Sequence, residues 1–149
     1  MPVRDIDGAN LTQSLAILEY LDETRDPGLW PDAPLDRAGV RAIAADVHPV
    51  RNLRLLKNAT GHSGGSISIE AGMQALIAPG LAAVEAIVTG DQHSFGSSVR
   101  LANLCLLPQL YNGHRWRVNL SDTPNLTCIG AHLQILPAFA ATHPDLTPR

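Results

Sequence analysis

The chain lacks an apolar run long enough to cross a membrane, and it lacks a concentration of charge of either sign. Its 149 residues carry 11 Lys and Arg against 14 Asp and Glu, a formal net charge of −3, with the basic residues scattered. A spanning helix needs about 20 consecutive apolar residues, and nucleic acids or anionic membranes are bound by clustered basic residues. We therefore expect neither a membrane-spanning segment nor a polyanionic partner.

Cysteine is scarce, and the histidines are not grouped. Cys105 and Cys128 fall inside apolar helical patterns, where a free thiol packs as a small hydrophobic group, so we expect both to be buried. The six histidines do not stand at metal-ligand spacing, which argues against a zinc site. Met1-Pro2 does not begin a signal peptide, so the expected location is the cytoplasm.

The first 25 residues favour two strands and a helix. Residues 1–6 have the composition of a short strand, Asp7-Gly8 is a hairpin turn pair, and residues 9–11 can return as a second strand. Apolar residues then follow helical spacing, and we expect a helix to open near Gln13-Ser14. The sequence therefore predicts a ββα unit at the start of the chain.

The rest of the chain is predicted to be helical. Pro27-Gly28 and the run WPDAP (30–34) mark a linker, so we place a boundary near residues 25–35. A helix follows from about Asp36, with Val40, Ile43, Val47 and Val50 as its apolar stripe and a kink at Pro49, and residues 57–68 are a loop. Three apolar stripes of helical period indicate further helices: Met73 to Val88, Leu101 to Tyr111, and Leu126 to Leu136. The first stripe is interrupted at Pro79-Gly80. Thr123 and Pro124 before the third stripe are predicted to be its N-cap and first helical residue.

Five segments carry a resemblance to a known family. They are LTQSLAILEYLDE (11–23), DVHPVRNLRLL (46–56), LANLCLLPQLYN (101–112), RWRVNLSDTPNL (115–126) and PAFAATHPDLTP (137–148). Together they resemble the zeta class of the glutathione transferase superfamily, the maleylacetoacetate and maleylpyruvate isomerases. The resemblance covers nearly the whole chain and is weakest between residues 58 and 75.

The resemblance implies a mainly α fold. Residues 1–27 would be a remnant of the thioredoxin-like domain that binds glutathione, and residues 28–149 the all-helical C-terminal domain. The implied activity is the glutathione-dependent cis-trans isomerisation of maleylacetoacetate to fumarylacetoacetate. The implied ligands are glutathione and a small dicarboxylic substrate, and the implied assembly is a homodimer.

Part of the implied glutathione site lies at the predicted helix start. Backbone N–H groups and the positive end of the helix dipole attract an anion there. The family assigns this position the γ-glutamyl carboxylate, bound by Ser14 and Gln13, whereas the residues alone would make Ser14 an ordinary N-cap. Met1-Pro2 matches a Val-Pro pair whose cis bond lets the first residue bind glutathione through its backbone, although a trans bond near a frayed end is the alternative.

Four further residues are nominated by position. His48 and Asn52 share one helix face and match glutathione contacts of the zeta class, with Arg54 nearby; alternatively His48 is a partly buried helix residue and Arg54 part of a solvated face. Arg115 matches an arginine that orients a substrate carboxylate, for which a planar guanidinium is suited. Without the family, Arg115 would be a surface arginine stacked on Trp116.

The 149 residues contain no Ser-Ser-Cys motif, which in the family steadies the glutathione thiolate, so no catalytic residue is assigned. We expect an N-terminally truncated chain without isomerase activity of its own, and Met1 in place of an internal valine rather than at the biological start.

Two helical features also depart from the family. Arg100 and Asn103 stand where the family has a Thr-x-x-Asp capping box, unless Ser97 or Ser98 caps that helix. Pro79 interrupts an apolar helical stripe.

Two rival interpretations stay open at this point. The first is a non-catalytic helical module that uses the transferase-like fold for association with another protein. The second is a degraded gene without a stable product, suggested by the capping and proline departures. The sequence does not decide between maleylacetoacetate and maleylpyruvate as substrate.

Overall fold

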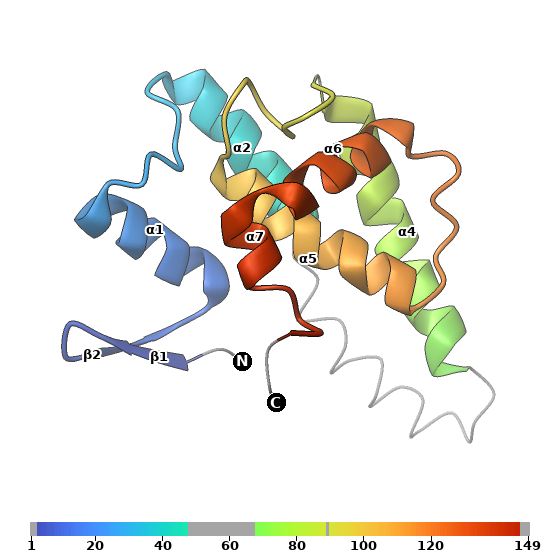
Figure 1. Ribbon diagram of the computed structural model, residues 1–149, viewed down its shortest axis with the longest axis horizontal. Helices are drawn as coiled ribbons and strands as arrows, with labels where there is room; N and C mark the ends of the chain where they lie inside the picture. Colours follow the sequence, from blue (N-terminus) through green and yellow to red (C-terminus); the bar gives the residue numbers. More distant parts are fainter. Residues whose placement is uncertain (1–2, 48–67, 89, 147–149) are drawn as a thin grey trace.

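A computed structural model of the chain describes residues 3–47, 68–88 and 90–146. Over these ranges the molecule is mainly helical, with one small sheet, as predicted (Figure 1). In chain order, the elements are β1 (Val3–Ile6), β2 (Ala9–Thr12), α1 (Ser14–Arg25), α2 (Pro34–Asp46), α4 (Ile69–Ile87), α5 (Leu101–Arg115), α6 (Pro124–Ile135) and α7 (Pro137–Ala141).

The two strands form the predicted antiparallel hairpin, with Val3 opposite Thr12 and Ile6 opposite Ala9. The turn residues Asp7 and Gly8 have φ values of 53° and 78°. A two-residue hairpin turn with positive φ at both positions matches the twist of the strands, and Asp-Gly is among the pairs that tolerate it. The local sequence was therefore sufficient to predict this turn.

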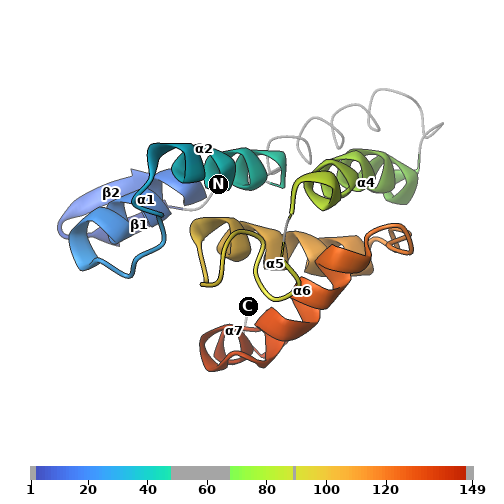
Figure 2. The same cartoon turned by 90° about the horizontal axis from the view of Figure 1, so that it is seen from above.

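Helices α2, α4 and α6 pack around α5, and these four helices build the core. Figure 2 shows α2 and α4 on one side of α5 and α6 on the other, and α5 contacts all three. The predicted stripes supply the buried side chains. Those with almost no exposed surface include Val40, Ile43 and Val47 near α2, Ile77, Leu81 and Val84 on α4, Leu101 and Leu106 on α5, and Leu126, Ile129 and Leu133 on α6.

The segment between α1 and α2 is fixed to the start of α5. The backbone N–H of Leu101 donates to the carbonyl of Leu29 at 3.1 Å, and the Arg100 guanidinium donates to the carbonyls of Gly28 at 2.6 Å and Trp30 at 3.2 Å. This segment lies where the linker was predicted. The division into residues 1–27 and 28–149 as two domains stays a prediction.

Pro79 does not interrupt its helix, so the predicted break is wrong. Helix α4 runs without a gap from Ile69 to Ile87, with Pro79 inside it on the exposed side. Ser68 caps the start, its hydroxyl accepting from the N–H of Ala71 at 3.0 Å. Gly80 lies so close to α2 that a Cβ added there would be 2.9 Å from the carbonyl oxygen of Asp46.

The capping of α5 differs from both alternatives drawn from the sequence. Arg100 itself is the N-cap residue, so neither Ser97 nor Ser98 caps this helix. The Asn103 side-chain oxygen accepts from the backbone N–H of Arg100 at 3.0 Å, which is one half of a capping box. The departure from Thr-x-x-Asp therefore preserves a cap, and the Arg100 side chain is used to hold the preceding segment.

Two smaller predictions need correction, and a third is confirmed. Helix α2 begins at Pro34 rather than at Asp36, since proline is well suited to the first helical position. Thr123 is the N-cap residue of α6 and Pro124 its first helical residue, as predicted, although the Thr123 hydroxyl donates to the carbonyl of Leu120 and makes no capping bond to the helix. Cys105 is buried as expected, whereas Cys128 is exposed because it lies on the outer face of α6. The predicted kink at Pro49 lies outside the described residues, as do residues 57–67 of the loop predicted over 57–68, whose last residue, Ser68, is the N-cap of α4.

Candidate functional site

The corner between β2 and α1 has the geometry of an anion-binding helix start. Ser14 is the first residue of α1, and Gln13 before it has φ 72° and ψ 121°. Positive φ is uncommon for a residue with a side chain, and such conformations gather at ligand sites. Ser14 is therefore not the N-cap residue itself, which corrects the interpretation drawn from the residues alone.

The start of α1 is not capped by the side chain of its own N-cap residue. The Gln13 side chain makes no capping hydrogen bond, and the first turn of α1 contains no acidic residue. The first N–H to bond within the helix is that of Ile17, which donates to the Gln13 carbonyl at 3.0 Å. The preceding amides and the helix dipole thus favour a carboxylate at this corner.

Arg115 is the last residue of α5 and is exposed to solvent. Its guanidinium carbon lies 5.8 Å from the centre of the Trp116 ring, within the distance of a cation-π contact. This confirms the stacking expected from the residues alone, and the carboxylate role stays untested. Within the described residues, no hydrogen bond or ion pair joins Arg115 to Ser14.

The other nominated ligands, Met1, His48, Asn52 and Arg54, all lie outside the described residues. Two of the seven nominated positions, Gln13 and Ser14, are therefore brought together by the fold, and they are neighbours in the sequence. Their proximity was already implied by the chain, whereas the positive φ of Gln13 was not.

Sequence reasoning missed a cavity of about 790 Å³ beside α5. Apolar side chains of α5 and α7, among them Leu104, Leu107 and Phe139, form much of its wall. Tyr111, His143 and Asp145 also line it. The Tyr111 hydroxyl donates to Asp145 at 2.7 Å, and His143 packs edge-on against Tyr111 with ring centres 5.6 Å apart. Helical period predicted that these α5 residues share a face, but gave no sign that the face borders a cavity.

Burial changes the ionisation of two groups away from the corner. It raises the pKa of the Cys105 thiol to about 11, so this cysteine stays protonated and unreactive near neutral pH. Burial also lowers the pKa of His93, with a further contribution from His132, whose ring centre is 5.2 Å away. Neither group contributes a nucleophile or base at the α1 corner.

The described ranges contain no group of three or more His, Cys, Asp and Glu side chains arranged to hold a metal ion. None of their helices has the length and apolar character that crossing a bilayer requires.

Known proteins similar to the chain were found by sequence and by structure. No model of a protein family matches it. Maleylacetoacetate isomerase of Rhizobium meliloti (strain 1021) is 44% identical over 155 residues, covering 97% of this chain and 72% of the relative. Maleylacetoacetate isomerase of Mus musculus is 37% identical and covers 99% of this chain and 69% of the relative.

Two solved structures have the same arrangement of helices and strands as this chain. A holo maleyl pyruvate isomerase, described as a bacterial zeta-class glutathione S-transferase, superposes with a TM-score of 0.89 at 32% identity, covering 99% of this chain and 74% of that one. Maleylacetoacetate isomerase from Anaeromyxobacter dehalogenans 2CP-1, with glutathione bound in its active site, gives 0.85 at 36% identity, covering 96% and 69%.

Proposed function

The chain belongs to the maleylacetoacetate isomerase family of zeta-class glutathione transferases, and from this membership we propose that it serves the glutathione-dependent cis-trans isomerisation of maleylacetoacetate to fumarylacetoacetate. The observation that carries the proposal is the 44% identity to the Rhizobium meliloti enzyme over 97% of the chain. The strained backbone at Gln13-Ser14 supports it independently, because the helix start offers backbone donors to an anionic ligand.

In this proposal the corner binds a carboxylate of glutathione. The amides at the start of α1 and the Ser14 hydroxyl donate hydrogen bonds, and the Gln13 side chain contributes a polar contact. Hydrogen bonds to a charged acceptor are roughly twice as strong as neutral ones, so a few suffice to orient a flexible tripeptide. Met1, His48, Asn52 and Arg54 are proposed as its further contacts.

Arg115 is proposed to orient a carboxylate of the dicarboxylic substrate. A guanidinium stacked on Trp116 has lost part of its freedom before the substrate arrives, which lowers the entropic cost of a bidentate contact. When bound, glutathione supplies the thiolate that adds to the cis double bond, and rotation followed by elimination gives the trans product. The protein residues contribute position and charge complementarity.

The remaining features of the proposal follow the family. Residues 1–27 form part of the glutathione-binding domain and residues 28–149 the helical domain, the assembly is a homodimer, and the location is the cytoplasm. Because the 149 residues contain no Ser-Ser-Cys motif, we expect them to bind glutathione weakly and to show no turnover above the glutathione-only background.

A glutathione titration tests the proposal. Addition of glutathione to the ¹⁵N-labelled chain should shift the amide signals of Ser14 and Leu15, and Ser14→Ala should weaken the effect. Ser121→Ala, which alters an exposed serine before α6, is the control and should bind like the parent. A chain whose α1 amides do not respond to glutathione would contradict the proposed site and favour a non-catalytic association module.

A further inference from the structure

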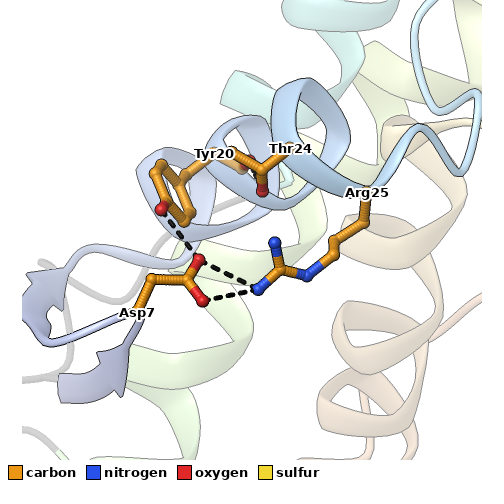
Figure 3. A network of polar contacts seen from close by, with 4 residues as sticks. All are labelled: Asp7, Tyr20, Thr24 and Arg25. Carbon is orange, nitrogen blue, oxygen red and sulfur yellow. Dashed lines mark hydrogen bonds and ion pairs between the residues drawn. The ribbon is translucent and has the colours of Figure 1, made fainter.

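The turn of the β-hairpin is tied to helix α1 through a single carboxylate. Asp7 accepts a hydrogen bond from the Tyr20 hydroxyl at 2.8 Å. It also accepts from the Arg25 guanidinium, at 2.7 Å to one carboxylate oxygen and 2.9 Å to the other (Figure 3). Tyr20 lies in the second turn of α1 and Arg25 is its last residue, so Asp7 fastens the turn to the C-terminal half of the helix.

The hairpin therefore is held at two ends. At one end β2 continues through Gln13 into the start of α1, and at the other Asp7 binds the later turns of the same helix. Between these ends the hairpin offers little apolar burial, since Ile6 and Leu11 are only half-buried and most other described positions are exposed. A two-stranded hairpin with so little core is marginal without other support.

We propose that Asp7 is a positioning residue that, by anchoring the hairpin along α1, holds Gln13 in its positive-φ conformation and so keeps the carboxylate-binding corner formed. This inference rests on the proposed glutathione site, which it deepens by naming the group that shapes it. If the hairpin is released at its turn, it pivots about Gln13, and the strained backbone relaxes toward the common extended region.

The charge state of Asp7 agrees with this role. Hydrogen bonds from Arg25 and then Tyr20 hold the pKa of the Asp7 carboxyl below its usual 3.8, so the anchoring form is the one present at neutral pH. Asp7 also has φ 53°, a conformation that Asn tolerates equally well. Asp7→Asn consequently removes the charge and weakens the anchor without breaking the turn.

The test compares Asp7→Asn with Asp5→Asn in the full chain. Asp5 lies in the same hairpin, is exposed, and pairs with Asn10 across the strands, so its substitution changes net charge equally. The readout is the intraresidue contact between the amide proton and Hα of Gln13 in NMR, which is strong when φ is positive. We expect this signal to weaken in Asp7→Asn and to persist in Asp5→Asn.

Glutathione affinity gives the second readout. We expect Asp7→Asn to bind about two- to fivefold more weakly than the parent, the effect of losing an exposed ion-paired anchor, and Asp5→Asn to bind equally. Tyr20→Phe, which removes one anchoring bond only, should give a smaller change and serves if Asp7→Asn does not fold. An unchanged Gln13 signal in both Asp7→Asn and Tyr20→Phe overturns the inference. If the parent chain does not bind glutathione, the proposed glutathione site is refuted, and the Gln13 signal alone tests whether Asp7 anchors the hairpin.

Discussion

Glu85 of α4 caps helix α6 by accepting a hydrogen bond from the backbone N–H of Leu126 at 3.0 Å. Its second carboxylate oxygen accepts from the neighbouring N–H of Asn125 at 3.1 Å. A carboxylate at a helix start satisfies unpaired donors and complements the helix dipole. A residue 41 positions away thus performs the capping that local sequence had suggested for Thr123.

We expect Glu85→Ala to lower the free energy of unfolding by about 1–2 kcal/mol, the cost of losing a helix cap. Glu85→Gln should lower it less, because the amide oxygen still accepts one of the two bonds. Urea melts give the measurement, and Glu23→Ala, at an exposed position on α1, is the control. Equal stability of Glu85→Ala and the parent would show that water caps α6 adequately.

Pro79 and Gly80 are neighbours for which alanine should have opposite effects. Pro79→Ala restores a backbone donor inside a continuous, exposed stretch of α4, and should raise stability by about 1–3 kcal/mol. Gly80→Ala should lower stability, because its Cβ would lie 2.9 Å from the Asp46 carbonyl oxygen. If Pro79→Ala melts at the same urea concentration as the parent, the helix accommodates the proline without strain.

Arg100→Thr should destabilise the chain, contrary to what the family capping pattern suggests. The substitution removes the hydrogen bonds from the guanidinium to Gly28 and Trp30, and bonds from charged donors contribute about 1.5–3 kcal/mol when partly buried. Arg100→Lys should recover part of the loss. A more stable Arg100→Thr variant in urea melts would mean that an N-cap hydroxyl outweighs the contacts to the linker.

The hairpin anchor should weaken at acid pH. The folded-state pKa of Asp7 lies below 3.8 because of Arg25 and Tyr20, so its contribution to stability is complete above the unfolded-state pKa and is lost as pH falls through the folded one. The protection of the hairpin amides against exchange, taken relative to their intrinsic exchange rates, should fall as pH is lowered from 6. In Asp7→Asn this protection should already be lower at pH 6 and should lack this pH dependence.

In a form of the protein that turns over maleylacetoacetate, Arg115→Ala should lower kcat/KM by about 10- to 150-fold. This corresponds to loss of a charge-assisted contact of about 1.5–3 kcal/mol. The matched control is Arg117→Ala, since Arg117 is also exposed near the end of α5 and pairs with Glu70 at 3.5 Å. If steady-state kinetics show an unchanged kcat/KM in Arg115→Ala, then Arg115 is only a surface residue stacked on Trp116.

The sequence by itself determined the hairpin, the order of most helices and the faces they bury. Asp7-Gly8 was predictable because its backbone preference is local. Val40, Ile43 and Leu133 were predictable as core residues because helical period places apolar side chains on one face. Ser14 was placed at a helix start for the same reason, since the apolar spacing begins just after it.

Only the tertiary structure decided how the helix ends are satisfied and how the corner is shaped. Glu85 reaches α6 from another helix, and Arg100 bonds to Gly28, 72 residues away. The positive φ of Gln13 arises where a hairpin joined to α1 at one end is fastened to it at the other. Such contacts link residues far apart in the chain, so their geometry depends on how whole elements pack and has no local periodic signal in the sequence.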